Sequence, residues 1–309
     1  MNLACPRDRA ALARRDDEVE CASGHRYRVV EDIPVLLVPE DEPTHGACWT
    51  SLDDVGDVDG DADAFVQNAI AATCGNLYRH MIGNLREYPI PEIRLPSGDG
   101  QTFLEVGCNW GRWCVSAARR GYRVTGVDPS LDAIRAAQRV AGELHVDAQY
   151  VVADARHLPF ADGSFDVVFS YSVFQHFTRA AAVAAFDEIG RVLKPGGRSL
   201  VQMANVWGAR SLANQLRERR FREPRSLFDV RYWSTGELQR ELERAVGPTE
   251  LSVDGFLTLN PQPADLRLLP RRYRALVRMS EAYRRASSRL PFLVHAADSL
   301  YASSRRAPK

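Results

Sequence analysis

The sequence predicts an α/β fold built on a mostly parallel sheet. Two apolar runs, 102–106 and 122–127, are nearly continuous, as in strands buried on both faces. A turn with two glycines follows the first run, and 112–120 then shows the apolar spacing of a helix. The order strand, turn, helix, strand is typical of a parallel βαβ unit.

Four residues fall at the carboxyl ends of these two strands: Glu105, Gly107, Gly111 and Asp128. In open parallel sheets ligands bind at this edge, near the N-terminus of the first helix. The glycine spacing does not match the Gly-x-Gly-x-x-Gly turn that approaches a pyrophosphate. Because a carboxylate accepts several hydrogen bonds, Asp128 suits paired ribose hydroxyls. We therefore expect a nucleoside ligand without a pyrophosphate.

Five ordered motifs extend this pattern over about 102–203. They are Glu105-x-Gly107-x-x-x-Gly111, Val127-Asp128, Ala153-Asp154-Ala155, Phe165-Asp166-x-Val168-x-Ser170 and Val192-Leu193-Lys194-Pro195-Gly196-Gly197. In this order and spacing they resemble class I S-adenosylmethionine-dependent methyltransferases of the type 11-like group. The resemblance implies a Rossmann-like, doubly wound, mostly parallel seven-stranded sheet.

The resemblance also implies a set of cofactor-binding residues. In the family the acid matching Asp154 accepts from the adenine amino group, and the next N–H, here of Ala155, meets a ring nitrogen. Asn109 stands where the family usually has glycine, but asparagine tolerates left-handed backbone well enough for the turn to persist. The full set is Glu105, Gly107, Asn109, Gly111, Asp128, Asp154, Ala155 and Ser170.

The segment after the strand at 165–170 faces the place where a methyl group would be presented. Its His176 is the best candidate general base, because imidazole titrates near neutral pH. A structural or cofactor-contacting histidine is the alternative, since many methyl transfers depend on alignment alone. Aromatic faces favour a sulfonium cation, which makes Trp110, Tyr171 and Phe174 candidates for its surroundings.

The first 39 residues resemble a small zinc-ribbon-like module, known as a methyltransferase activator and at the start of some bacterial methyltransferases. A zinc ribbon needs two ligand pairs from two tight turns, and the residues offered here are Cys5, Asp8, Cys21 and His25. Because Asp8 replaces a cysteine, we expect a metal-free module, with zinc as the alternative. Such a module also offers a surface for a protein partner.

The remaining chain is predicted from its local patterns. Residues 40–64 form an acidic linker, and a helix over 65–87 offers Tyr78 and Arg79 as weak ligand contacts. Ser130 caps a helix reaching 142, and Trp233-Ser234 open another over 235–245. Further strands are expected at 148–153, 165–170, 199–203 and 249–257, and helices at 180–193 and 264–303, with Tyr273, Phe292 and Tyr301 as apolar anchors. The expected units are 1–39, the linker, a methyltransferase domain at 65–260 and a helical extension at 261–309.

The net charge of zero is unevenly distributed. Residues 1–100 carry 9 basic and 19 acidic side chains, whereas 205–309 carry 20 and 11. The basic end could meet an anionic substrate, a membrane surface or nucleic acid, or it could face the acidic end. Scattered cysteines, no signal-peptide pattern and no long apolar run predict a cytoplasmic protein without a transmembrane segment.

We therefore expect a methyltransferase that transfers a methyl group from S-adenosylmethionine to a small molecule, at oxygen, nitrogen or carbon. One alternative is an rRNA or tRNA methyltransferase, favoured by the zinc-ribbon-like start. The acidic first hundred residues argue against nucleic acid, because they repel phosphates. The other alternative is a binding protein that has kept the fold without turnover. The acceptor and the oligomeric state are open at this stage.

Overall fold

A computed structural model describes residues 2–41, 63–73, 85, 87–217, 230–257 and 261–308. Most of the acidic linker lies outside these residues, as do Tyr78 and Arg79. Of the helix expected over 65–87, the described part is α1 (Ala64–Thr73), which Asp63 caps by accepting from the backbone N–H groups of Phe65 and Val66.

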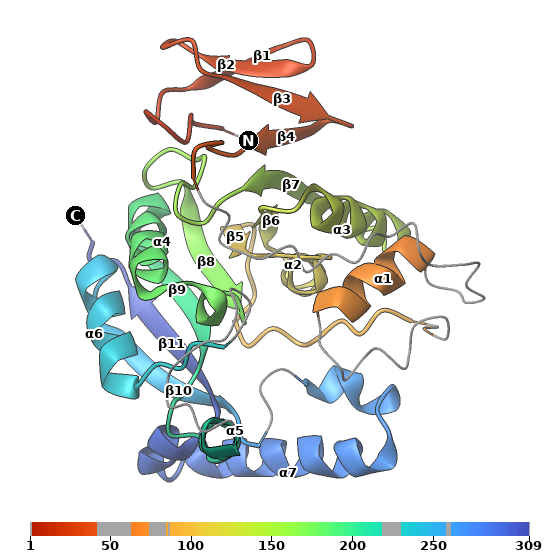
Figure 1. Cartoon of the computed structure of the whole chain (residues 1–309), viewed down its shortest axis with the longest axis vertical. Coiled ribbons are helices and arrows are strands. Elements are labelled where there is room, and N and C mark those ends of the chain that lie inside the picture. Colours follow the sequence, from red (N-terminus) through yellow and green to blue (C-terminus); the bar gives the residue numbers. More distant parts are fainter. Residues whose placement is uncertain are drawn as a thin grey trace.

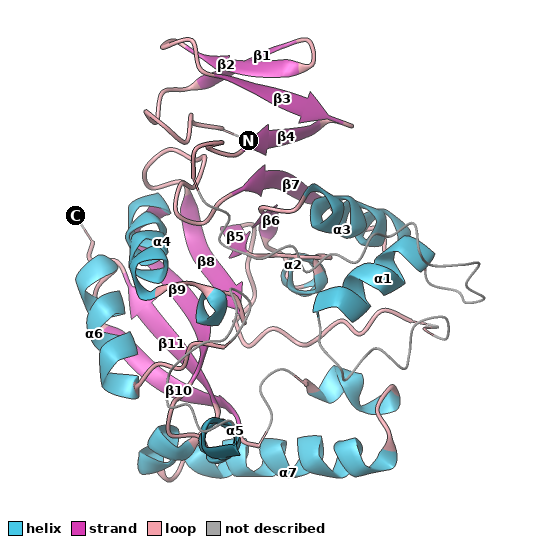
Figure 2. Ribbon diagram, viewed as in Figure 1, coloured by secondary structure: helices cyan, strands magenta, loops and turns pink. Residues whose placement is uncertain are grey.

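The described strands form one eleven-stranded sheet (Figures 1 and 2) in the order β1-β2-β3-β4-β7-β6-β5-β8-β9-β11-β10. Six neighbouring strands, from β4 to β9 in this order, run parallel. The strands are β1 (Leu12–Arg15), β2 (Glu18–Cys21), β3 (Arg26–Val30), β4 (Ile33–Leu36), β5 (Thr102–Val106), β6 (Arg123–Asp128), β7 (Ala148–Ala153), β8 (Phe165–Tyr171), β9 (Leu193–Ala204), β10 (Thr249–Gly255) and β11 (Ser299–Arg305). The expected α/β fold with a mostly parallel sheet is confirmed.

Helices cover both faces of this sheet (Figure 1). On one face, α2 (Arg112–Arg119) and α3 (Leu131–Glu143) pack on β5, β6 and β7. On the other, α4 (Arg179–Val192) and α6 (Thr235–Ala245) pack on each other and over β9, β10 and β11. Two apolar cores result, one on each side of the central strands. Among the described residues, no helix has both the length and the apolar character needed to cross a membrane.

The N-terminal module is continuous with the central sheet. Its last strand, β4, pairs in parallel with β7 through Val35 and Val152. A second link forms where the Ala4 backbone N–H donates to the Pro159 carbonyl at 2.9 Å. Because Cys5 is also part of the core on the α4 side, residues 2–36 pack as an extension of the larger domain.

Two elements differ from expectation. The stretch 264–303 was predicted to be helical, but Ser299–Arg305 is strand β11, inserted between β9 and β10. As a strand, this segment pairs with the backbones of both neighbours and buries Tyr301. These tertiary contacts outweigh the helical pattern of the local sequence. The predicted strand 199–203 begins earlier, at Leu193, because Leu193 pairs with Phe165 before a bulge. Phe292, predicted as an apolar anchor, is 66% exposed.

The remaining helices follow their local signals. Ser130 accepts from the Ala133 backbone N–H at the start of α3. Ser234 and Glu237 form a complete capping box at the start of α6, as the sequence pattern predicted. The C-terminal third adds α5 (Ala209–Arg217), α7 (Arg271–Ser287) and the short helices η5 (Pro263–Arg267) and η6 (Pro291–Ala296).

Candidate functional site

The turn after β5 is held against the end of β6 by backbone hydrogen bonds. The N–H groups of Gly107 and Cys108 both donate to the Val127 carbonyl, at 2.8 and 2.9 Å. Gly107, Asn109 and Gly111 have φ values of 75°, 48° and 79°. Asn109 therefore adopts the left-handed conformation expected of it, and its Oδ1 accepts from the Trp110 N–H at 2.6 Å.

Both glycines of this turn lie where a side chain would not fit. A Cβ on Gly107 would stand 2.3 Å from Val173 Cγ2, in the segment after β8. A Cβ on Gly111 would stand 3.0 Å from the Tyr150 hydroxyl and 3.1 Å from Ala137 Cβ. The turn is thus packed between β8 on one side and α3 and β7 on the other.

Asp128, at the carboxyl end of β6, holds the turn in place. Its carboxylate accepts from the backbone N–H groups of Asn109 and Ser130, each at 3.0 Å. These bonds hold the side chain at the carboxyl end of β6 with 9% of the residue exposed. A carboxylate can accept several hydrogen bonds at once, so the same side chain can bond backbone N–H groups and ligand hydroxyls together.

Glu105 is the most perturbed acid of this group. It is 1% exposed, and its Oε2 has no hydrogen-bond partner. Burial raises the pKa of Glu105 to about 8, although hydrogen bonds from Cys114 oppose the shift. A buried carboxyl group with an unsatisfied oxygen beside Asp128 marks this edge of the sheet as a site for a polar ligand.

Asp154 is less open than the sequence suggested. Its carboxylate accepts from the Arg156 backbone N–H at 2.8 Å and forms a salt bridge with the Arg156 guanidinium, also at 2.8 Å. Ala155 between them is buried. A donor from a ligand must therefore share Asp154 with Arg156, a contact between near neighbours that the motif did not reveal.

The end of β8 carries two polar side chains that point to opposite faces. Ser170 is fully buried and donates its hydroxyl to the Val106 carbonyl at 2.9 Å, which ties β8 to the start of the glycine turn. Tyr171 donates to Asp254 Oδ2 at 2.8 Å and accepts from Gln262 Nε2 at 2.7 Å. Ser170 thus shapes the turn through backbone, whereas Tyr171 connects the site to the C-terminal third.

Sequence reasoning missed the cluster around Asp254. This 5% exposed carboxylate accepts from Tyr171, Ser299 and Arg94, at 2.8, 2.7 and 2.8 Å. The ring of Tyr301 packs against the ring of Tyr171, with 6.0 Å between their centroids. The Tyr301 hydroxyl is buried and has no hydrogen-bond partner. Strand β10 carries two acids, Glu250 and Asp254, and only the structure shows that Asp254 is the buried one.

The predicted catalytic and aromatic residues occupy different environments. His176 ends the short helix η4 (Phe174–His176) and is half-buried, with Nε2 3.4 Å from Gln175 Nε2. Phe174 is fully buried in the core against Phe186. Trp110 is 1% exposed and belongs to the cluster that packs α1 against α3. Because Phe174 is a core residue, Tyr171 fits the predicted role beside the sulfonium better than Phe174 does.

The four candidate metal ligands of the N-terminal module converge on one point. Their ligand atoms all lie within 4.8 Å of one another. His25 Nδ1 is 3.4 Å from Cys5 Sγ, 3.5 Å from Cys21 Sγ and 3.2 Å from Asp8 Oδ2. Tetrahedral zinc, with bonds of about 2.0–2.3 Å, separates its ligand atoms by roughly 3.3–3.8 Å. The donor set and its spacing therefore fit a zinc ion.

Two tight turns bring these ligands together. In the first, the Arg9 N–H donates to the Cys5 carbonyl and Arg9 has φ 63°. In the second, the Gly24 N–H donates to the Cys21 carbonyl and Gly24 has φ 82°. The arrangement of two ligands per turn is what a zinc ribbon requires.

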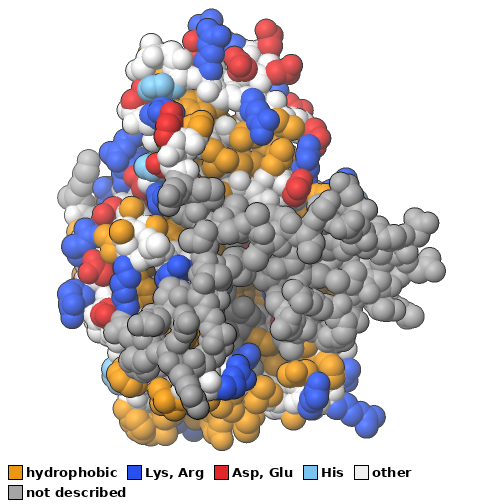
Figure 3. Space-filling model, viewed as in Figure 1, with side chains coloured by type: hydrophobic (Ala, Val, Ile, Leu, Met, Phe, Trp, Pro, Cys, Tyr) orange, Lys and Arg blue, Asp and Glu red, His pale blue; other side chains and the backbone are white. Residues whose placement is uncertain are grey.

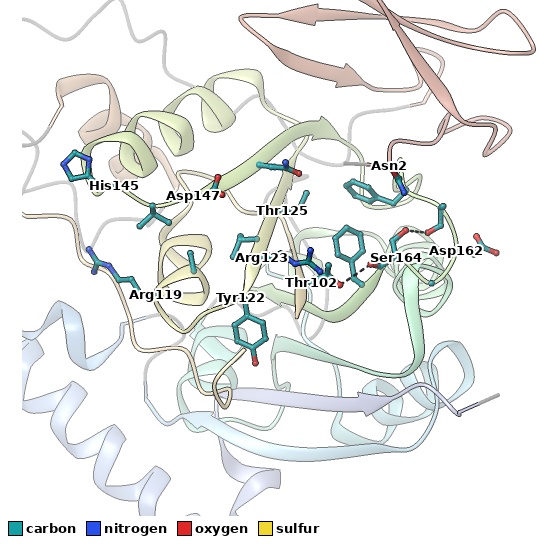
Figure 4. A pocket seen from close by; sticks show the side chains of 18 residues that line it. Asn2, Thr102, Arg119, Tyr122, Arg123, Thr125, His145, Asp147, Asp162 and Ser164 are labelled. Carbon is teal, nitrogen blue, oxygen red and sulfur yellow. Dashed lines mark hydrogen bonds between the residues drawn. The ribbon is translucent and has the colours of Figure 1, made fainter. Parts of the chain in front are cut away.

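A large hollow of about 880 Å³ lies elsewhere, at the amino ends of the strands (Figure 4). Its lining includes Thr102, Arg123 and Ser164, which come from neighbouring strands and the loop before β8. Thr102 bonds Asp166, Arg123 donates to the Gly100 carbonyl, and Ser164 donates to the Ala161 carbonyl. These polar groups serve the fold, and ligands of such sheets bind at the opposite edge.

Comparisons with known proteins agree with this geometry. Residues 103–197 match the family described as methyltransferase domain. The O-methyltransferase resE of Aspergillus sclerotiorum is 36% identical over 157 residues, which cover 50% of this chain and 57% of that protein. The 2-methyl-6-phytyl-1,4-hydroquinone methyltransferase of a Synechocystis strain is 31% identical over 158 residues, covering 51% and 44%. The chain thus spans about half the length of these relatives.

Among solved structures, a SAM-dependent methyltransferase of Methanosarcina mazei is similar with a TM-score of 0.49 and 19% identity. That match covers 68% of this chain and 94% of the other. The family match and the two relatives carry the assignment. Residues 103–197 are thus similar to the methyltransferase domain family, in agreement with the ordered motifs of the sequence.

Proposed function

We propose that the chain transfers a methyl group from S-adenosylmethionine to a small-molecule acceptor. The observation that carries the proposal is the arrangement of the glycine turn and two acids, Glu105 and Asp128, at the carboxyl ends of β5 and β6. Asp128 is oriented by backbone N–H groups of Asn109 and Ser130 at the carboxyl end of β6, and Glu105 has a buried, unsatisfied oxygen. Both features suit a ligand with hydroxyl and ammonium donors.

The residues proposed to hold the cofactor follow from this arrangement. Asp128 would accept from the ribose hydroxyls, and the turn around Gly107 would let the ligand approach the backbone. Asp154 would accept from the adenine amino group alongside Arg156, with Ala155 beside it. The remaining members of the proposed set are Glu105, Asn109, Gly111 and Ser170.

When bound, S-adenosylmethionine supplies an electrophilic methyl group on a sulfonium centre. The chain's contribution is alignment and the exclusion of water. His176, at the end of η4, is the proposed base for an acceptor that must lose a proton. Its position depends on Arg231, whose guanidinium donates to the His176 carbonyl at 2.6 Å.

Oxygen is the acceptor atom we propose first. The relative from Aspergillus sclerotiorum is named an O-methyltransferase, and a 33% identical relative from a Bradyrhizobium strain is named a ubiquinone biosynthesis O-methyltransferase. An oxygen acceptor also gives His176 a proton to remove. RNA and a non-catalytic binding role remain the alternatives, and no observation in the structure favours either over a small molecule.

Calorimetric titration with S-adenosylmethionine tests the proposal. We expect micromolar binding by the wild type and a loss of about tenfold to a hundredfold in Asp128→Ala, since removing an acceptor of charge-assisted bonds costs about 1.5–3 kcal/mol. Asp162→Ala, an exposed acid near the opposite edge of the sheet, is the matched control and should bind normally. No binding by a folded wild type would contradict the cofactor assignment and favour the scaffold alternative.

We further propose that Cys5, Asp8, Cys21 and His25 hold a structural zinc ion. This reverses the expectation from sequence, because the four ligand atoms converge at zinc-like spacing. Elemental analysis of the purified protein should give one zinc per chain. A strong chelator should remove this zinc, and β1–β4 should then lose their protection from hydrogen exchange. Unchanged exchange in metal-free protein would support a metal-free module.

We also propose a compartment and a site for a protein partner. None of the four described cysteines, Cys5, Cys21, Cys108 and Cys114, forms a disulfide, which suits the reducing cytoplasm. A protein partner that docks on the N-terminal module stays a prediction. Its available surface is the outer edge of β1, the strand at the end of the sheet.

A further inference from the structure

The C-terminal end of the molecule gathers its exposed apolar side chains in one place. In the described part of the chain, every large apolar residue that is exposed belongs to α5, α7, η6 or the residues beside them. They are Trp207, Leu216, Met279, Tyr283, Leu290 and Phe292. Figure 3 shows hydrophobic side chains gathered along the edge of the molecule formed by α5 and α7. We call this group the apolar edge.

Helix α7 presents two adjoining stripes to solvent. Positions three, four or seven apart share a face of a helix. One exposed stripe is mainly apolar and contains Met279 and Tyr283, with alanines at 275, 282 and 286 and with Arg272 in the first turn. The neighbouring stripe is basic: Arg271, Arg278 and Arg285 lie seven residues apart. The opposite face, with Val277 buried, packs on the domain next to β10.

The charge around the apolar edge is predominantly positive. Between residues 267 and 292 the chain has eight arginines and a single acid, Glu281. Glu281 is already bound by Arg284 and Arg285. Among described residues, no carboxylate lies within ion-pair distance of Arg271, Arg278 or Arg289. These three cations therefore stand beside exposed apolar groups without local neutralisation.

We propose that the apolar edge and the basic stripe of α7 form a docking surface for anionic lipid membranes. A helix with arginine on one stripe and large apolar residues on the next lies in the bilayer interface, with charges toward the headgroups. A nucleic acid would use the arginines but would leave Leu216, Leu290 and Phe292 in water. A neutral protein partner would bury the apolar groups but leave the arginines unmatched. Of these three occupants, the anionic lipid surface is the one that uses both features.

Co-sedimentation of the full chain with vesicles tests this proposal. We expect binding to vesicles of phosphatidylcholine and phosphatidylglycerol in equal parts, weak binding to phosphatidylcholine alone, and weakening with added salt. The pair Arg278→Gln and Arg289→Gln should reduce partitioning by about fivefold per arginine. The matched pair Arg28→Gln and Arg240→Gln, exposed arginines on β3 and α6 rather than in the apolar edge or on α7, should change it little.

The apolar contribution is tested separately. Met279→Ser with Phe292→Ser should lower partitioning by about tenfold or more, whereas the pair Met279→Leu and Phe292→Leu should retain it. Both positions changed are exposed, so thermal unfolding should confirm that each variant folds. Equal losses in both arginine pairs would reduce the effect to general charge attraction and overturn the proposal.

Other occupants of the surface would give different results. Light scattering should show a monomer in the absence of vesicles. A dimer that the serine pair dissociates, without vesicle binding, would assign the edge to a second copy of the chain. Salt-sensitive retention of RNA, abolished by the arginine pair and untouched by the serine pair, would assign it to nucleic acid. Either result would overturn the proposal independently of whether the chain binds S-adenosylmethionine.

Discussion

The N-terminal ligand cluster and the carboxylate pocket at the ends of β5 and β6 collect polar groups in opposite ways. In the cluster, Cys5, Asp8, Cys21 and His25 lie mainly against one another, and two local turns bring them together. In the pocket, Asp128 is held by backbone N–H groups from two segments, and the sheet itself supplies the geometry. On the zinc proposal an ion completes the cluster, whereas backbone hydrogen bonds orient Asp128 in the pocket without a ligand.

This difference predicts where each region is vulnerable. Loss of a ligand to the ion should weaken the module far more than loss of one pocket side chain weakens the domain, because metal binding by such modules is itself folding free energy. In the pocket, backbone conformation and burial should determine how much a substitution changes stability and cofactor binding. The four predictions below test this contrast, in order of decreasing effect.

Cys21→Ser should give the largest effect. Replacing a thiolate ligand should cost on the order of 4 kcal/mol or more of module stability, the range reached when a metal is lost. Hydrogen exchange over β1–β4 should rise, and the zinc content should fall. Cys108→Ser, a buried free thiol outside the cluster, should leave the zinc content unchanged. Equal zinc content in both variants would remove the metal from the comparison.

Glu105→Gln should change the pH dependence of stability by a few kcal/mol, since one pKa unit corresponds to about 1.4 kcal/mol. Burial raises the pKa of Glu105 from 4.5 to about 8, with Cys114, Asp128 and Arg112 as its charged or titratable neighbours. The native state therefore holds a proton that the unfolded chain releases. The wild type should lose stability as pH rises from about 5 to about 8, and the variant should not.

Asp166→Asn provides the control of opposite sign. Burial opposes ionisation of Asp166, but bonds from Lys194 and Thr102 outweigh it and lower the pKa. Asp166 therefore contributes stability above its unfolded pKa, which is lost as pH falls. Thermal unfolding of the three proteins across pH measures both effects. Parallel profiles for the wild type and Glu105→Gln would contradict the buried-acid account.

Gly107→Ala should destabilise the domain by about 2 kcal/mol and weaken cofactor binding. The new Cβ would meet Val173 in addition to adopting a positive φ. Gly100→Ala isolates the backbone term, because Gly100 has φ 79° and nothing within 4 Å of its Cβ position. Its cost should be only about 1 kcal/mol. Denaturant unfolding that finds equal costs would show that Val173 moves aside freely.

Asn109→Gly should have the smallest effect, within about 0.5 kcal/mol. Glycine removes the strain of φ 48° but loses the Oδ1 bond to the Trp110 N–H and gains freedom when unfolded. Asn109→Ala, which keeps the strain and loses the bond, should cost about 1 kcal/mol more. Calorimetry should find near-normal S-adenosylmethionine binding in the glycine variant. A large loss there would give Asn109 a direct role in binding.

Much of the fold and of the pocket could be predicted because its signals are local. The strand–turn–helix at 102–120, the left-handed Asn109 and the capping box at Ser234 each follow from residues within one or two turns of one another. Strand β11 could not be predicted in the same way, since its residues have no strong preference by themselves. They become a strand because β9 and β10 both present unpaired backbone edges to them.

The amino-acid sequence by itself determined the order of the elements and the turn that carries the pocket, because periodicity and turn chemistry act over a few residues. Tertiary structure alone decided that Asp254 meets Tyr171 across 83 positions and that the four module ligands share one point. Contacts of this kind depend on strand register and on which turns face each other, and a shift of one residue in a strand would send each side chain to the other face of the sheet.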